Sequence, residues 1–559
     1  MIFYLPPELS IKCLWLADSI DVVQCRRICK AFDRLINESL LLQFKLMLTK
    51  HGYDNAIVTS KASTIERLEG LRRHVEAWAD PRIDMNEATV ISPKWEGSTY
   101  ELQGGLFIAG HPGEHNTRLT RALTFLELPW RNRDASINEG GVVHEIADLG
   151  IDARDFQVDP SQNLLVLVGA ITEASVDDNV WAFRIHFRTI DTNTQHPLAQ
   201  KPFIDMEISS GAVSMDDISV GFIIQIMDDV VAVVALQYYG HPWIITPSKV
   251  EIVNWQTGQA YTSIEVMGAD SLVFLDEMTF LLPRRAGMPP TDLSLDVYKF
   301  HRSPLARDDP ATEHRGAVCI GTFQFPDIPN RVTAMTRSRA RCEPALSYRR
   351  TPAKRTSILT SPEEMFRPSQ SSRIITLSFG TRRHAGGQVH AQEYTVIISA
   401  EGIRRLAVDL KATDSDDTPV IPVPWCEWGP YTTRWFNEGT QTHWICYSFG
   451  SRFIRRKAGQ SQGRLELFDF NPGPIHGDSN LGVDETGSDY GVKILKEPSV
   501  MRSPEWAGTF DSSLPCRHTT TKGGTKARVS AVMIDQERVI VVAEDRQDLS
   551  NSNFHVLNI

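Results

Sequence analysis

The sequence predicts an α+β multidomain chain in which a small N-terminal all-α region is followed by an all-β domain, for which a divergent β-propeller of about seven blades fits best. Three observations predict this fold. Apolar residues recur at helical spacing over the first 50 residues, whereas from about residue 95 they alternate at every second position. A six-residue strand pattern then recurs about seven times at intervals of 45 to 100 residues, and strand repeats at such intervals are typical of propellers.

The composition is that of an ordinary globular protein, with 559 residues, 42% hydrophobic and 23% charged. A net charge of −11 argues against a chain that coats nucleic acid or an anionic membrane surface. Eight cysteines without a C-x-x-C motif do not form a disulfide framework. The first residues lack the basic and apolar regions of a signal peptide. We therefore expect a cytoplasmic or nuclear protein with free thiols.

The N-terminal segment reads LPPELSIKCLWLADSIDVVQCRRICKAF over residues 5–32. Pro7 suits the first position of a helix, and Glu8 complements the positive end of the helix dipole. Apolar residues follow at helical spacing in two runs that are separated by a polar break at residues 18–19. About 45 residues of short helices are too few to bury a competent core alone. The segment is therefore expected to bind a partner.

This segment resembles an F-box, the adaptor-binding motif of ubiquitin ligase complexes, in the form LPxELLLKIL…DLLRCRRVCRRF. The register holds without a gap from Leu5 to Phe32, and residues 26–29 read RRIC where the family has RRVC. The chain departs from the pattern at Ser10, Trp15, Ala17 and Ser19. The resemblance implies a fold of short helices that docks on a Skp-family adaptor and, through it, on a cullin–RING ligase.

The adaptor-binding residues implied by the resemblance are mostly apolar. They are Leu5, Pro6, Glu8, Leu9, Ile11, Cys13, Leu14, Val22, Val23, Cys25, Ile28, Cys29 and Phe32.

A linker helix is predicted within residues 51–94. Ser63 and Glu66 form a capping box, the apolar positions that follow are spaced as on a helix, and Asp80-Pro81 ends the run.

The repeat of the β-domain, residues 95–559, is a six-residue strand. It occurs as LTFLEL (123–128), IHFRTI (185–190), VEIVNW (250–255), LDVYKF (295–300), YTVIIS (394–399), LELFDF (465–470) and FHVLNI (554–559). An apolar strand precedes each copy, in order GGLFIAG, NLLVLVG, DVVAVVAL, MTFLLP, IITLSFG, WICYSFG and RVIVVAE. Turn residues before several of these strands are Asp159, Asp228, Asp276, Asn437 and Asp535. Residues 250–258 are similar to the third strand and turn of a WD repeat, while two β-sandwiches remain the alternative fold.

Two segments interrupt the repeat. Residues 331–373 contain nine Arg and one Lys against three acids and few apolar residues, which predicts a disordered insertion. Its arginines could also form a nuclear-localisation patch or a phosphorylation-regulated tether. Residues 458–492 have a loop composition.

Known catalytic and nucleotide-binding motifs are missing: the sequence has no P-loop, G-x-G-x-x-G, G-x-S-x-G or H-E-x-x-H. Cys25 and Cys29 are read as small apolar residues and not as metal ligands. His476-Gly477-Asp478-Ser479 is read as a loop, since a catalytic triad is defined by geometry and not by contiguity. We expect a protein that is not an enzyme and has no catalytic residues, no cofactor and no metal.

The sequence thus predicts a substrate-recognition adaptor. An F-box at 1–50 would dock on a Skp-family adaptor, a linker helix region would span 51–94, and the β-domain at 95–559 would capture a substrate protein. Two alternatives stay open: a propeller-type enzyme or ligand-binding protein, and an interaction scaffold that carries an F-box without ligase activity.

Overall fold

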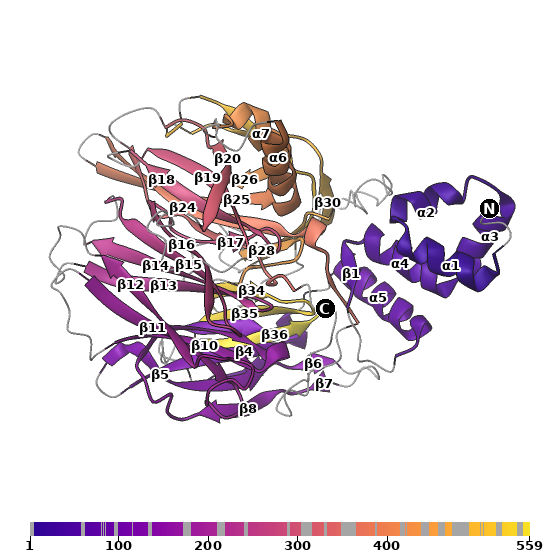
Figure 1. Cartoon of the computed structure of the whole chain (residues 1–559). Helices are drawn as coiled ribbons and strands as arrows, with labels where there is room; N and C mark the ends of the chain where they lie inside the picture. The colour runs from indigo at the N-terminus through magenta and orange to yellow at the C-terminus, as the bar shows by residue number, and fades with distance from the viewer. Residues whose placement is uncertain are drawn as a thin grey trace.

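The computed structural model of the chain describes most of the sequence and shows a small helical end beside a large β region (Figure 1). The described residues are 5–56, 62–79, 81, 83, 85–93, 95, 99–113, 116–131, 137–171, 180–209, 218–239, 244–287, 291–302, 316–328, 333–347, 365–385, 388–413, 420, 422–437, 446–456, 464–471, 491–503, 505–506, 508–520, 528–544 and 552–559.

Four short helices form the N-terminal end, and we call residues 5–50 the helical module. They are α1 (Pro7–Leu16), α2 (Ser19–Cys25), α3 (Lys30–Glu38) and α4 (Leu40–Lys50). Pro7 opens α1 as predicted, and at the start of α4 the Ser39 hydroxyl accepts the Leu42 N–H at 3.4 Å. The module buries a small core of its own, formed by Leu14, Val22, Phe32, Ile36 and Leu42. The predicted N-terminal all-α region is confirmed.

Helix α5 (Thr64–Ala79) connects the module to the β region. Its capping box is present, since the Ser63 N–H donates to Glu66 Oε2 at 2.7 Å and the Glu66 N–H donates to Ser63 Oγ at 3.4 Å. Beside it, β1 (Tyr53–Asn55) pairs antiparallel with β23 (Phe366–Pro368), which lies more than 300 residues further along the chain. The junction is therefore built from segments that lie far apart in the sequence.

The β region consists of successive antiparallel meanders, which we number 1 to 7 within the described residues. Meander 1 is β3 (Tyr100–Gln103), β4 (Leu106–Gly113), β5 (Asn116–Glu127) and β8 (Gly141–Ile146); meander 2 is β9 (Ala153–Asp159), β10 (Leu164–Ala170), β11 (Val180–Thr189) and β12 (Phe203–Ser209). Meander 3 is β13 (Ile218–Met227), β14 (Val230–Tyr239), β15 (Pro247–Asn254) and β16 (Gln259–Met267); meander 4 is β17 (Val273–Phe274), β18 (Thr279–Ala286), β19 (Asp292–Phe300) and β20 (Ala317–Gln324).

The remaining meanders are less regular. Meander 5 is β21 (Thr333–Met335), β22 (Arg339–Arg341), β24 (Ile374–Ala385), β25 (Gln388–Ser399) and β26 (Thr433–Phe436); meander 6 is β27 (Ser448–Phe449), β28 (Arg452–Arg456), β29 (Leu465–Asp469), β33 (Cys516–Thr520) and β30 (Gly491–Leu495). Meander 7 is β34 (Arg528–Ile534), β35 (Arg538–Glu544), β36 (Ser552–Asn558) and β2 (Thr89–Ile91). Short pairs β6 (Trp130–Arg131) with β7 (Ile137–Asn138) and β31 (Ser499–Met501) with β32 (Phe510–Ser512) lie outside the meanders.

Each meander shares a buried apolar cluster with the next one along the chain. The clusters join meanders 1 and 2, 2 and 3, 3 and 4, 4 and 5, 5 and 6, and 6 and 7. A further cluster joins meander 7 to meander 1, with Phe554 edge-on to Phe107 at 4.8 Å. Strand β2 also adds to meander 7 from the N-terminal side, because Ile91 pairs with Phe554. The last meander therefore packs on the first.

The predicted repeat strand is confirmed in all seven places. Each copy forms the third strand of its meander, namely β5, β11, β15, β19, β25, β29 and β36. Six of the seven preceding strands are confirmed as second strands. The sixth prediction was wrong: in WICYSFG the strand β27 is the first of meander 6, and the second strand, β28, begins after a turn in which Gly450 has φ +61°.

The predicted turn residues also fall where first strands end, except one. Asp159, Asp276 and Asp535 each accept a backbone N–H two residues ahead. Asp228, with φ +53°, begins the two-residue turn between β13 and β14. Asn437 was a wrong prediction, because it follows β26 at the end of meander 5.

The two segments that interrupt the repeat, residues 331–373 and 458–492, differ most from the structure that the sequence predicts. Residues 333–347 and 365–373 were predicted to be disordered, but they contain β21, β22 and β23 and bury Met335, Ala340 and Arg373. Residues 331–332 and 348–364 lie outside the described residues. Within 458–492, β29 is the predicted repeat strand, while the start of β30 is strand where loop was predicted. Residues 458–463 and 472–490 lie outside the described residues.

Two helices inside the β region were not predicted. These are α6 (Ala400–Thr413) and α7 (Trp425–Thr432), inserted between β25 and β26. They pack on meanders 4 and 5, where Ile403, Trp425 and Trp428 belong to the shared buried cluster.

Candidate functional site

The helical module exposes large apolar side chains that its own core does not cover. Leu16 is 85% exposed at the end of α1, Ile20 is 71% exposed at the start of α2, and Ile28 is 62% exposed. Leu9 and Leu16 lie seven residues apart and so share one side of α1. We define the exposed apolar set as Leu5, Leu9, Leu16, Ile20, Val23 and Ile28.

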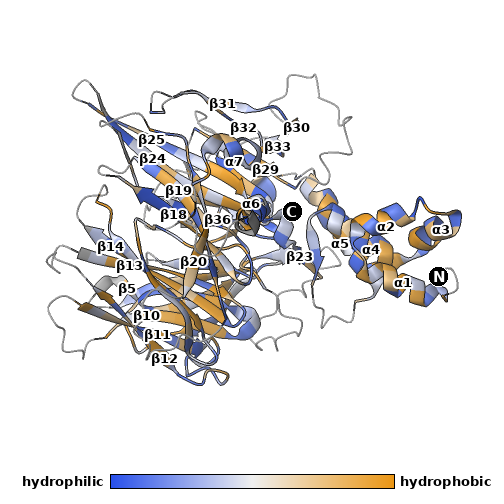
Figure 2. Ribbon diagram, turned by 45° about the horizontal axis from the view of Figure 1, so that its top comes forward, coloured by the Kyte–Doolittle hydropathy of each residue, from blue (hydrophilic) through white to orange (hydrophobic). Residues whose placement is uncertain are grey.

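The module projects away from the β region, with α1, α2 and α3 at its far end (Figure 2). A partner of the exposed apolar set would therefore meet the module beyond the β region. Fully burying one such leucine or isoleucine contributes about 1.5–3 kcal/mol. The set is the best-defined protein-docking surface among the described residues.

The residues implied by the F-box resemblance divide into three groups. Leu5, Pro6, Glu8, Leu9, Cys13, Val23 and Ile28 are exposed, while Ile11, Cys25 and Cys29 are half-buried. Leu14, Val22 and Phe32 are buried in the core of the module. Short helices need such apolar side chains to hold one another, and a contact of these three with an adaptor stays a prediction. Leu16, Ile20 and Leu40 are exposed residues that sequence reasoning missed, although their apolar character was a readable signal.

The junction between α5 and the β region is a buried polar and aromatic network. The Tyr53 hydroxyl accepts from Arg452 Nη2 at 2.6 Å and lies 2.7 Å from His74 Nε2. Trp78 Nε1 donates to the Gln536 carbonyl at 3.1 Å, and the Arg452 guanidinium lies 4.2 Å from the Trp78 ring. Burial holds the pKa of His74 well below its usual value, so the ring is neutral at pH 7. These contacts hold α5 in one orientation on meanders 6 and 7.

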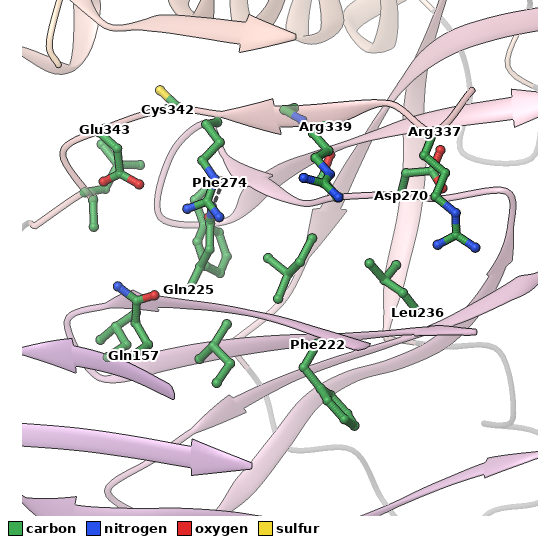
Figure 3. Close-up of a pocket in the computed structure, with 18 of the residues that line it drawn as sticks. Gln157, Phe222, Gln225, Leu236, Asp270, Phe274, Arg337, Arg339, Cys342 and Glu343 are labelled. Carbon is green, nitrogen blue, oxygen red and sulfur yellow. Dashed lines mark hydrogen bonds between the residues drawn. The ribbon is translucent and has the colours of Figure 1, made fainter. Parts of the chain in front are cut away.

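A cavity of about 190 Å³ lies between meanders 2, 3, 4 and 5. In Figure 3, Arg337, Arg339 and Glu343 come from one side of the cavity, and Gln157 and Phe222 from the other. Its lining residues are Gln157, Phe222, Ile223, Ile224, Gln225, Ile226, Leu236, Tyr238, Asp270, Ser271, Phe274, Arg337, Arg339, Ala340, Arg341, Cys342, Glu343, Ala345, Leu346 and Arg373. Sequence reasoning missed this site, since its arginines were assigned to a disordered insertion.

Carboxyl groups gather around Arg341 at one end of the cavity. Burial raises the pKa of Glu101 to about 8 and the pKa of Asp155 to about 7, and burial also raises the pKa of Glu343. Burial disfavours the charged form of Arg341 as well, but Glu101 and Glu343 outweigh it and raise the pKa of its guanidinium. With its amide nitrogen turned toward Glu101, Gln157 donates to Glu101 Oε1 at 3.0 Å. Arg341 and these three carboxyl groups thus form one buried cluster beside the cavity.

The pKa of Glu101 gives a first testable prediction. In the folded chain this carboxyl keeps its proton up to pH about 8, whereas the unfolded chain loses it near 4.5. Between these pH values the folded state binds more protons than the unfolded state, so stability falls as pH rises through this window. Glu101→Gln removes this loss. The variant should gain on the order of 2 kcal/mol over the wild type between pH 5 and pH 8 in urea unfolding.

Glu265→Gln, a change of the same kind at an exposed position, is the matched control and should not alter the pH dependence. Parallel stability curves for wild type and Glu101→Gln would contradict a buried, protonated Glu101.

The described part of the chain lacks metal-binding groups and membrane-spanning helices. No group of three or more His, Cys, Asp or Glu side chains there could hold a metal ion. None of its helices has the length and apolar content needed to cross a bilayer. The His476–Ser479 loop lies outside the described residues.

Comparison with known proteins finds similar solved structures. No protein-family model matches the chain, and the search of curated proteins finds no match. The chain is similar to the WD40 domain of SCAP from fission yeast, with 8% identity, a TM-score of 0.28, and coverage of 84% of this chain and 95% of that one. Because this superposition is so loose, the description of the β region depends on its own strands and clusters.

Proposed function

We propose that the chain is the substrate-recognition adaptor of a Skp/cullin/F-box-type ubiquitin ligase. In this function the helical module docks on a Skp-family adaptor, and the β region captures a substrate protein. The observation that carries the proposal is the exposed apolar set on a module whose sequence resembles an F-box. Ubiquitin transfer would be catalysed by partner enzymes, and the chain itself would act without enzymatic activity in the cytoplasm or nucleus.

The proposal includes a closed β-propeller of seven blades, one blade for each meander. Two features support closure. Buried clusters join each meander to the next and meander 7 to meander 1. Strand β2 completes meander 7 from the N-terminal side, which removes an exposed sheet edge. A propeller suits substrate capture because its loops converge on rigid faces.

The junction supports a fixed geometry between the two docking surfaces. Helix α5 and the adjacent strand β1 are held on the β region by the Tyr53–His74–Arg452 network and by the pairing of β1 with β23. A substrate on the β region would then be held at a set orientation relative to the ligase. Such positioning favours transfer, since oriented groups react far faster than freely diffusing ones.

The proposed function is tested by affinity purification of the tagged full chain from cells, followed by quantitative mass spectrometry. A Skp-family adaptor and a cullin should accompany the wild type. Ile20→Asp should reduce both by about tenfold or more, because a charge replaces an exposed apolar contact. Val408→Asp, at an exposed position on α6, is the control and should retain both.

Two outcomes would contradict the proposal in different ways. Full recovery of the adaptor with Ile20→Asp would exclude the exposed apolar set as its docking surface. Recovery of the adaptor without any cullin would replace the ligase by an interaction scaffold.

A further inference from the structure

The cavity between meanders 2 to 5 is lined by four arginines and only two acids, Asp270 and Glu343. Arg337, Arg339 and Arg373 line it, and none of the three has an ion pair with a carboxylate in the described part of the chain. Arg373 is 4% exposed and donates to the carbonyls of Phe274 and Cys342, while its Nε has no hydrogen-bond partner. A buried cationic group in this state is stabilised when an anion approaches.

Asp270, the nearest acid to Arg337, is already neutralised. Arg285 binds it through two hydrogen bonds of 2.6 and 3.1 Å, and both residues are buried. The Ser338 N–H also donates to Asp270 Oδ2 at 3.0 Å. The oxygens of Asp270 are therefore occupied, which leaves the nearby guanidinium groups to another anion.

Arg337 and Arg339 form the accessible part of the charge. The Arg337 guanidinium lies 3.6 Å from the ring of Tyr238 and donates to the Gln237 carbonyl at 3.1 Å, which fixes its position. Arg339 is exposed on the cavity wall, and the described residues provide no hydrogen-bond partner for its side chain. Both extend from the same wall in Figure 3. Two adjacent guanidinium groups match the oxygens of a carboxylate or phosphate.

The opposite wall carries apolar side chains beside Gln157 and Gln225. Ile223 and Leu236 line it from meander 3, and Leu346 adds to it from the segment that follows β22. A bare inorganic ion would leave this surface unused. A ligand with an anionic head and an apolar body would contact both walls.

We propose that this cavity is a binding site for a small organic anion, with one carboxylate or phosphate group held by Arg337 and Arg339 and an apolar body against Leu236 and Leu346. The volume of about 190 Å³ is many times the roughly 10–15 Å³ that a cavity needs to hold one water, so a small organic molecule fits. The site shares no residue with the exposed apolar set, so the outcome of its test is independent of the ligase proposal.

The test measures the binding of small probes to the full chain. NMR saturation transfer detects binding, and titration gives the dissociation constant. The probes are phenyl phosphate, phenylacetate, the neutral benzyl alcohol and inorganic phosphate. Phenyl phosphate or phenylacetate should bind about tenfold more tightly than benzyl alcohol and inorganic phosphate. The tighter of the two organic anions identifies the head group.

Arg339→Gln should weaken the binding of the preferred anion by about tenfold, and its melting curve should match the wild type because the side chain holds no described contact. Arg405→Gln, at an exposed arginine on α6 that pairs with Glu401, should leave binding unchanged. Equal binding of benzyl alcohol and the organic anions, or unchanged binding by Arg339→Gln, would overturn the proposal. Binding of inorganic phosphate as tight as phenyl phosphate would overturn the role of the apolar wall.

Discussion

Deletion of residues 552–559 is expected to abolish stable folding of the β region. These residues contain the whole of β36, which lies between β35 and β2 and pairs with both. Phe554, Val556 and Leu557 are buried. The deletion would remove the contact between meanders 7 and 1 and expose the edges of two strands. We expect aggregation on expression, or a fall in melting temperature of more than about 10 °C.

A point variant separates this effect from the general cost of a deletion. Phe554→Ala should destabilise the chain by about 3–5 kcal/mol, since the phenyl ring is fully buried against Phe107. His555→Ala, at the next and half-buried position of the same strand, should cost less than about 1 kcal/mol. A truncated chain with an unchanged melting curve would show that β36 is dispensable and that the ring is not closed through meander 7.

Val22→Asp is expected to unfold the helical module, while Leu9→Asp leaves it folded. Val22 has no exposed surface and lies in the core of the module, so an unpaired carboxylate there costs about 3–5 kcal/mol. Leu9 is 46% exposed, and a charge at such a position changes stability by less than about 0.5 kcal/mol. Hydrogen exchange over residues 5–50 measures the difference.

The two variants should nevertheless agree in adaptor binding, which both should lose. Leu9→Asp would lose it with normal hydrogen-exchange protection, and Val22→Asp would lose it together with that protection. If Val22→Asp kept the protection of α2, the burial of Val22 in the module would be contradicted. Adaptor binding by Leu9→Asp at the wild-type level would exclude α1 from the docking surface.

The regular part of the β region could be predicted where strands are buried in alternation, as β11 is. Phe183, Ile185 and Phe187 on β11 face the shared core, while the residues between them are half-buried. Such alternation is readable in sequence wherever one face of a strand is packed. The prediction was wrong in meander 6 because its first strand has only two residues, Ser448–Phe449. Together with the apolar residues before it, this short strand was taken for a full second strand.

The cavity arginines and helix α6 were missed for other reasons. Arg337, Arg339 and Arg341 alternate as strand residues do, but their charge favoured a solvated loop, and only the fold shows that they face a cavity. Helix α6 carried a readable signal in Glu401, which pairs with both Arg404 and Arg405 at helical spacing.

The division of the F-box-like residues into core and surface could not be read from spacing, because both groups are apolar. Leu14 and Leu16 are two residues apart on α1, yet one is buried in the core of the module and the other is 85% exposed. The packing of four helices on one another decides this, and it is not a local property of the sequence.

The most direct test of the adaptor function is the titration of the purified full chain with a purified Skp-family adaptor. The proposal expects a one-to-one complex with a dissociation constant of about 1 μM or tighter, and a large negative heat-capacity change from the burial of apolar surface. No binding at adaptor concentrations of about 10 μM, by a chain whose helical module and β region are folded in hydrogen exchange, would contradict it.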